Sequence, residues 1–138
     1  MAEFVLKELL RRAEIDDVEV ESAAMHTDEI GSDVHFATRE MLRRADIPFS
    51  SRAAWLLTAS KAEAYDLIIG MDSYNIADLR RLVSREDHSK IHRLLEFAGS
   101  DADVADPWYT GDFESTLRDV MAGCRGLVAE LLKRRRNS

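Results

Sequence analysis

The chain has 138 residues, 46% hydrophobic and 33% charged, a balance typical of one globular domain. Its 26 acidic and 19 basic residues give a net charge of −7, which argues against a nucleic acid partner. The sequence contains no apolar run of membrane-spanning length, no secretory pattern and only one cysteine. We therefore expect a single cytoplasmic domain over residues 1–138, without a nucleic acid or membrane partner.

The first half of the chain predicts a helix, a strand and a second helix. Apolar residues recur at helical spacing over residues 1–13, with polar residues on the opposite face. These polar residues are Glu3, Lys7, Arg11 and Arg12. A short strand is predicted over residues 18–23, and Ser32 and Asp33 are expected to cap a second helix that ends near residue 45.

The second half continues this alternation. Thr58 is expected to cap a short helix over residues 59–64. The apolar run that follows, "YDLIIGMD" at residues 65–72, is typical of a strand buried on both faces of a parallel sheet. The remaining predicted elements are a helix, a strand and a long helix, over residues 73–83, 90–98 and 113–134. The alternation predicts an α/β fold with three layers, α/β/α, around a parallel sheet.

Several residues with chemical potential are interpreted as structural. Cys124 lies on the apolar stripe of the last helix, and Glu130 stands where a phosphate-binding cysteine loop needs arginine, so we expect a buried thiol rather than a nucleophile. His88 and His92 have a metal-binding spacing only on a helix, whereas a strand is predicted there, so no metal site is expected. The other histidines, His26 and His35, are isolated in the sequence. The basic run at residues 133–136 is interpreted as a favourable helix end.

The segment Asp106-Pro107-Trp108-Tyr109 is the strongest candidate for chemistry. Pro107 restricts the backbone of Asp106, and the two aromatic residues can wall a slot for a flat ring. A carboxylic acid beside such a slot can protonate a departing phenolate. The alternative is that Asp106 caps a turn while the rings fill the surface of the core, and the local residues leave both interpretations open.

The chain resembles the low-molecular-weight protein tyrosine phosphatase family along nearly its whole length. The segments that carry the resemblance are "VEVESAA", "TDEIG", "LTASKAEAYDLIIGMDSYNIADLRRL", "KIHRLLEFA" and "DVADPWYTGDFESTLRDVMAGCRGL". The resemblance implies a phosphotyrosine phosphatase I-like fold and hydrolysis of phosphotyrosine proteins or small aryl phosphates without a metal or cofactor. In such enzymes a cysteine thiolate attacks phosphorus, an arginine and loop amides hold the phosphoryl oxygens, and an aspartate acts as general acid and then base.

The resemblance assigns roles to five residues of this chain. Asp106 matches the general acid, and Trp108 and Tyr109 match the aromatic walls of the substrate slot. Asp28 and Glu29 fall in the loop that forms the opposite rim, where acidic side chains replace aromatic ones.

The main departure from the family lies at the start of the chain. The family commonly reads Cys-x5-Arg-Ser-Pro-Met-Ala-Glu after its first strand, and this chain begins at Met1-Ala2-Glu3. The first strand would lie between those matching residues 18–23 and 65–72, so its loss would leave backbone groups without partners. Three interpretations stay open: a start assigned at an internal methionine, a truncated relative that binds without catalysis, or a fragment that folds poorly.

The departure also leaves the function open. The chain as written is expected to lack phosphatase activity, because the nucleophile loop is missing. The alternatives are a non-catalytic phosphotyrosine-binding or interaction module and an arsenate reductase, although arsenate reduction in the related fold requires further cysteines.

Overall fold

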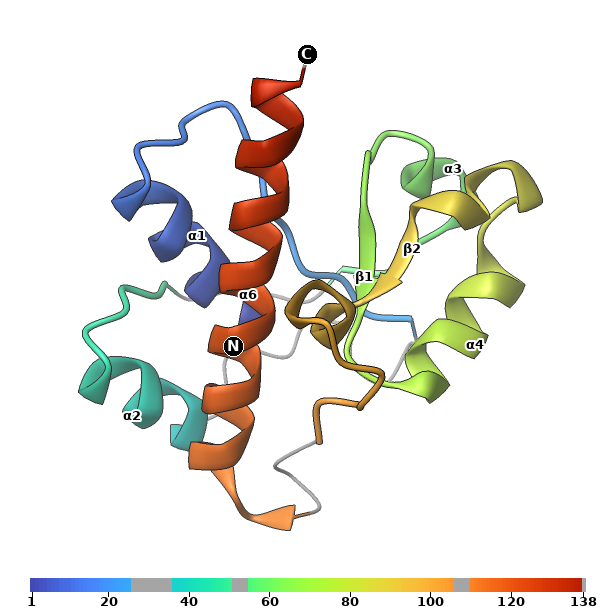
Figure 1. The fold of residues 1–138 in the computed structure, drawn as a ribbon. Helices are drawn as coiled ribbons and strands as arrows, with labels where there is room; N and C mark the ends of the chain where they lie inside the picture. The colour runs from blue at the N-terminus through green and yellow to red at the C-terminus, as the bar shows by residue number, and fades with distance from the viewer. Residues whose placement is uncertain (26–35, 51–54, 106–109, 138) are drawn as a thin grey trace.

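A computed structural model describes residues 1–25, 36–50, 55–105 and 110–137 of the chain (Figure 1). Three helices lie on one side of a small parallel sheet: α1 (Ala2–Arg12), α2 (Phe36–Arg44) and α6 (Phe113–Arg136). The helices α3 (Ala59–Ala62) and α4 (Ser73–Leu82) lie on the other side. The structure therefore confirms the predicted α/β class. None of the helices in the described ranges is long and apolar enough to cross a membrane.

The sheet consists of β1 (Ile68–Gly70) and β2 (Ile91–Arg93), which run parallel with Ile69 opposite His92. A separate parallel bridge joins Ala24 to Leu56, and here the Ala24 amide donates to the Trp55 carbonyl over 2.7 Å. The strands are thus parallel, as the alternation of elements predicts.

Two strand predictions are wrong in their extent. The segment over residues 18–23 forms no strand, and only the adjacent Ala24 makes a bridge. The predicted strand over residues 65–72 is reduced to Ile68–Gly70, and Ile68 and Ile69 are half-buried rather than enclosed on both faces. The physical reason is pairing, because a strand persists only where a neighbour accepts its hydrogen bonds. Within the described ranges, β2 is the only strand paired with β1.

The predicted strand over residues 90–98 is also wrong beyond its first residues. After β2, the chain forms a 3₁₀-helix, η3 (Leu94–Ala98). Another 3₁₀-helix, η2 (Arg85–Lys90), comes directly before β2. The Glu96 carboxylate accepts a hydrogen bond from the Arg93 amide, and Gly99 ends the turn with φ +76°. This geometry buries Leu94 and Leu95 in the core against α6, which outweighs their fit to a strand.

The helix predictions are confirmed more closely. The Thr58 hydroxyl accepts a hydrogen bond from the Lys61 amide at 3.1 Å and so caps the start of α3, as predicted. Asp72 caps α4 in the same way, with its carboxylate accepting the Asn75 amide over 2.8 Å. The predicted capping residues of α2, Ser32 and Asp33, lie outside the described residues.

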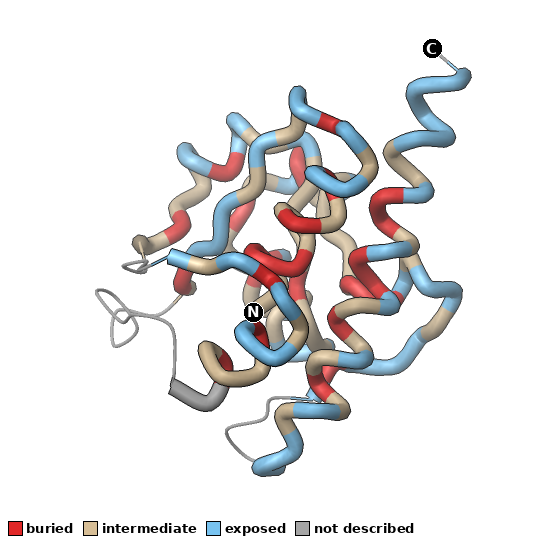
Figure 2. The backbone as a smooth tube through the Cα atoms, turned by 90° about the vertical axis from the view of Figure 1, so that its left-hand side faces the viewer, coloured by how far each residue is buried: buried red, intermediate tan, exposed pale blue. Residues whose placement is uncertain are grey.

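The core lies between α1, α2, η3 and α6. Its most deeply buried side chains, each at most 2% exposed, come from all four elements: Val5, Leu42, Leu94, Val120 and Cys124. Figure 2 shows buried residues along much of α6 and an exposed C-terminal end. That end carries the basic residues 133–136, in keeping with their predicted place in the last helical turn.

One polar residue of α1 departs from the predicted helical pattern. Glu3, placed by periodicity on the polar face, is only 5% exposed. Its carboxylate accepts hydrogen bonds from the Lys7 ammonium and the Ser22 hydroxyl, each with a donor–acceptor distance of 2.6 Å. The segment that follows α1 folds back over this face, so the Glu3 carboxylate is buried and hydrogen-bonded, although Ser22 is exposed and Lys7 is partly exposed.

Candidate active site

The five residues that the family resemblance singles out lie outside the described part of the structure. They are Asp106, Trp108, Tyr109, Asp28 and Glu29. Their assigned roles therefore stay predictions. The structure does describe the residues on both sides of the segment 106–109, and these locate its two ends in the fold.

The entry to this segment is attached to the carboxyl end of the sheet. The Val104 amide donates a hydrogen bond to the carbonyl of Met71, the residue directly after β1, at 2.9 Å. Val104 itself is buried, with 4% of its surface exposed. The carboxylate of Asp103 accepts the Ser73 hydroxyl at 3.0 and 3.2 Å and lies 3.6 Å from the Arg93 guanidinium. These contacts join Asp103 to α4 and to the end of β2. Ligands of parallel α/β sheets bind at the carboxyl ends of the strands, so this is the expected edge for a site.

The exit from the segment leads into the start of α6. Gly111 has φ +72°, a left-handed conformation that favours glycine. The Asp112 carboxylate then accepts the Ser115 amide over 3.0 Å and the Ser115 hydroxyl over 2.7 Å. These hydrogen bonds hold the pKa of Asp112 below its usual range, and the bond from the Ser115 amide has the larger effect. The chain therefore enters α6 through a capped first turn, and the capping carboxylate of Asp112 is stabilised in its charged form.

A buried hydroxyl connects the entry and the exit. Thr116 is 5% exposed, and its Oγ1 lies 3.0 Å from the Ala105 carbonyl and 3.2 Å from the Asp112 carbonyl. Sequence reasoning missed this residue, because a threonine early in a helix has no pattern that distinguishes such a contact. The contact joins residues 11 positions apart in the sequence, so it exists only in the folded chain.

The single cysteine occupies the core, as predicted. Cys124 is 1% exposed, and burial raises the pKa of its thiol to about 12. Its Sγ lies 4.0 Å from the Ala2 carbonyl, beneath the start of α1. A thiol with this pKa is protonated at neutral pH, and the protonated form is a poor nucleophile.

Cys124 is therefore expected to resist thiol reagents in the folded protein. An aromatic disulfide reagent at pH 8 should label it slowly in buffer and rapidly in urea, because unfolding restores the ordinary thiol pKa. The absorbance of the released thiolate gives both rates. Equal rates in the two solvents would contradict the burial of this side chain.

The amino terminus is also enclosed by the fold. Met1 precedes α1 without a side-chain cap, and burial lowers the pKa of its amino group. The start of α1 presents backbone N–H groups and the positive end of the helix dipole, features that favour anions. This geometry indicates the polarity of the region.

The histidines do not meet in the described part of the chain. His88 Nε2 lies 3.3 Å from the Val83 carbonyl, whereas His92 Nδ1 lies 2.7 Å from the Glu96 carboxylate. Across the described ranges, no group of three or more His, Cys, Asp or Glu side chains is placed to hold a metal ion. His26 and His35 fall outside these ranges, and the absence of a metal stays a prediction.

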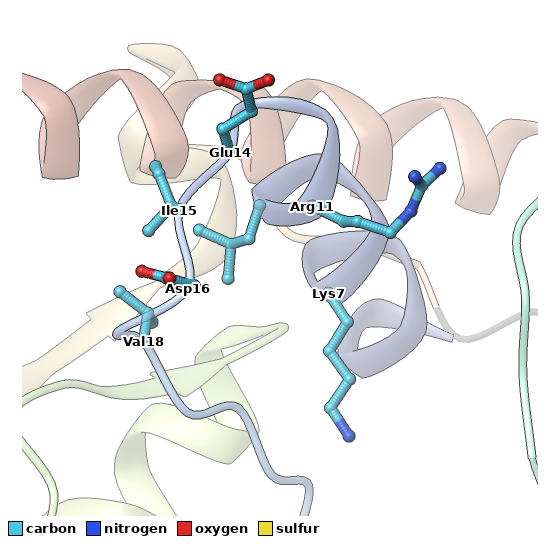
Figure 3. Close-up of a pocket in the computed structure, with 7 residues that line it drawn as sticks. Lys7, Arg11, Glu14, Ile15, Asp16 and Val18 are labelled. Atoms are coloured by element: carbon cyan, nitrogen blue, oxygen red, sulfur yellow. The ribbon is translucent and has the colours of Figure 1, made fainter.

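A shallow pocket of about 360 Å³ lies at the C-terminal end of α1 (Figure 3). It is lined by Lys7, Leu10, Arg11, Glu14, Ile15, Asp16 and Val18. Figure 3 shows the charged side chains of Lys7, Arg11 and Glu14 pointing in different directions rather than toward a common point. Binding sites bring a few polar groups together on one ligand, so this pocket lacks the arrangement of a site.

Comparison with known proteins identifies the family. A family model described as low molecular weight phosphotyrosine protein phosphatase matches residues 1–137. The chain belongs to this family, which confirms both the resemblance and the fold class.

Individual relatives agree with this assignment. The low molecular weight protein-tyrosine-phosphatase YfkJ of Bacillus subtilis (strain 168) is 35% identical over 136 residues, which cover 96% of this chain and 87% of that protein. Its crystal structure matches with a TM-score of 0.89 at 34% identity, covering 96% of this chain and 86% of that one. The low molecular weight protein tyrosine phosphatase of Streptococcus pyogenes matches with a TM-score of 0.79 at 31% identity, covering 94% of this chain and 82% of that one.

Proposed function

We propose that this chain provides the acid part of a phosphotyrosine phosphatase active site. Asp106 protonates the phenolic oxygen as it leaves phosphorus, and Trp108 and Tyr109 enclose the ring. Asp28 and Glu29 form the opposite rim of the slot. The observation that carries the proposal is the Val104–Met71 hydrogen bond, which places the entry to this segment at the carboxyl end of β1. The family membership supports the same assignment.

The chemistry explains why this reaction needs an acid. A tyrosine phenol has a pKa of about 10, so its anion is a poor leaving group at neutral pH. A proton delivered to the phenolic oxygen while the P–O bond breaks makes the leaving group a neutral phenol. The resulting carboxylate can then remove a proton from the water that attacks phosphorus in the second half of the reaction. We therefore assign both proton transfers to Asp106.

The chain does not supply the nucleophile for this reaction. Its single thiol belongs to Cys124, which is buried, has a pKa of about 12 and lacks a Cys-x5-Arg context. We propose that the 138 residues by themselves do not hydrolyse aryl phosphates. Activity requires a strand and a Cys-x5-Arg-Ser loop ahead of Met1, where the start of α1 would face the phosphoryl group.

The test compares the 138-residue chain with a fusion in which the first strand and cysteine loop of the Bacillus subtilis relative precede Met1. Hydrolysis of an aryl phosphate should be absent for the chain and should proceed at an enzymatic rate for the fusion. The control is the same fusion with its loop cysteine changed to serine, which should be inactive. Turnover by the chain alone would refute the missing-nucleophile proposal, and a folded but inactive fusion would refute the phosphatase proposal.

Two alternatives lead to different results in binding and redox assays. A non-catalytic phosphotyrosine-binding or interaction module would bind a phosphotyrosine peptide without the fusion, with the start of α1 as the anion contact. An arsenate reductase would pass oxidation to further cysteines, and the buried Cys124 is unsuited to that role. We favour the phosphatase because Val104, two residues before Asp106, is hydrogen-bonded to Met71 at the carboxyl edge of the sheet.

We further propose that the protein acts in the cytoplasm on phosphotyrosine proteins or small aryl phosphates, without a metal or cofactor. The single buried cysteine is in keeping with a reducing compartment. The net charge of −7 disfavours nucleic acid and anionic lipid as partners.

A further inference from the structure

The hydroxyl of Thr116 contacts the peptide bond that leads into the acid residue. Its Oγ1 lies 3.0 Å from the carbonyl oxygen of Ala105, and this carbonyl belongs to the peptide joining Ala105 to Asp106. We propose that Thr116 is a positioning residue for the general acid and acts through this peptide. The proposal rests on the proposed function, because it concerns how Asp106 is held for proton transfer.

The distances indicate which carbonyl oxygen accepts the Thr116 hydroxyl proton. The Thr116 hydroxyl has one proton and two carbonyl acceptors in reach, Ala105 at 3.0 Å and Asp112 at 3.2 Å. The shorter distance favours donation to Ala105. Because a peptide unit is planar, a hydrogen bond to the Ala105 carbonyl restrains the orientation of the whole unit between residues 105 and 106. The direction in which the chain enters the acid residue is thereby restrained.

The burial of Thr116 favours this contact over hydration of its hydroxyl. The residue is 5% exposed, so its hydroxyl is kept from bulk water and donates to a carbonyl oxygen instead, although Ala105 itself is exposed. Removal of the hydroxyl would take this partner from the Ala105 carbonyl. The hydroxyl is therefore suited to hold one orientation of the 105–106 peptide.

The hydroxyl is itself held by a rigid support. Thr116 lies early in α6, whose start is capped by Asp112, and the next turns of this helix bury Val120 and Cys124 in the core. On the other side, the Ser73 hydroxyl and the Arg93 guanidinium contact Asp103, three residues before the acid. The entry to the acid segment is thus held between α6 and the ends of β1 and β2. Catalytic groups need such support to stay in productive geometry.

A variant can remove the hydrogen bond with little change in shape. Thr116→Val keeps the branched side chain but removes the hydroxyl, whereas Thr116→Ser keeps the hydroxyl. Ser115→Ala is the matched control, because the Ser115 hydroxyl donates to the Asp112 carboxylate, at the cap of the same helix. Among these variants, only Thr116→Val should affect the 105–106 peptide.

The first measurement uses the 138-residue chain itself. Nuclear magnetic resonance should detect a change in the Ala105 carbonyl ¹³C shift and the Asp106 amide ¹⁵N shift in Thr116→Val, since both nuclei report hydrogen bonding at this carbonyl. Thr116→Ser should restore the original shifts, and Ser115→Ala should leave them in place. Unchanged shifts in Thr116→Val would overturn the proposal, whatever the activity of the protein.

The second measurement uses the active fusion described above. Thr116→Val should lower kcat for phosphotyrosine by about ten- to a hundredfold, the scale expected when a catalytic group is displaced. It should leave kcat nearly unchanged for an aryl phosphate with a good leaving group, which needs no proton, and Thr116→Ser should recover activity on phosphotyrosine. Equal losses on both substrates would overturn the positioning role. An inactive fusion would instead refute the proposed function, while the resonance shifts would still decide the contact.

Discussion

Replacing Asp106 by Asn in the active fusion is expected to lower kcat for phosphotyrosine by about 10²–10⁴-fold, the usual contribution of general acid catalysis. Asparagine keeps the shape of the side chain but has no acidic proton to deliver. The loss should be greatest for phosphotyrosine, whose phenolate is a poor leaving group. Steady-state kinetics on two aryl phosphates that differ in the pKa of the leaving phenol provide the measurement.

The dependence on the leaving group separates chemistry from folding. An aryl phosphate with a strongly acidic phenol should lose much less activity in Asp106→Asn, because its phenolate departs without a proton. A variant that merely misfolds would lose activity on both substrates alike, and such a result would favour the alternative in which Asp106 caps a turn. Unfolding midpoints of the two proteins serve as the control for stability.

Gly126→Ala is expected to destabilise the protein strongly, although alanine is normally the better helix former by about 1 kcal/mol. A Cβ atom at Gly126 would lie 2.0 Å from the Phe97 carbonyl oxygen and 2.5 Å from its carbonyl carbon. Both are backbone atoms of η3, which cannot rotate away as a side chain can. Overpacking of this kind destabilises by about 1–3 kcal/mol and sometimes more, so α6 and η3 must move apart or the fold must open.

Urea denaturation measures this effect as a lower unfolding midpoint. Ala129→Gly provides the matched control, because Ala129 lies exposed on the same helix and its replacement should remove only helix propensity, about 1 kcal/mol. Gly126→Ala should be the more damaging of the two despite the opposite propensity. A midpoint at or above that of the unchanged protein would show that α6 does not approach η3 so closely.

The helices of this protein could be predicted well because their signals are local. Apolar spacing predicted α1, α4 and α6, and the Thr58 hydroxyl does cap α3. A helix satisfies most of its hydrogen bonds within its own residues, so a short stretch of sequence contains most of the information.

The strands could not be predicted with the same accuracy because their hydrogen bonds depend on distant residues. The segments over residues 18–23 and 90–98 both have strand-like composition, yet neither forms a full strand. The first is followed by a single bridge at the adjacent Ala24, and the second turns into η3 to bury Leu94 and Leu95 against α6. Pairing and packing partners decided both outcomes.

The sequence by itself determined the α/β alternation and the core position of Cys124, and its resemblance to the family singled out Asp106, whose role stays a prediction. These conclusions follow from residue type, periodicity and a distinctive motif, all of which are local. Tertiary structure alone decided that Glu3 is buried and accepts a hydrogen bond from Ser22, and that Thr116 contacts Ala105. These contacts join residues 19 and 11 positions apart, and hydrogen bonds over such separations exist only once the chain has folded back on itself.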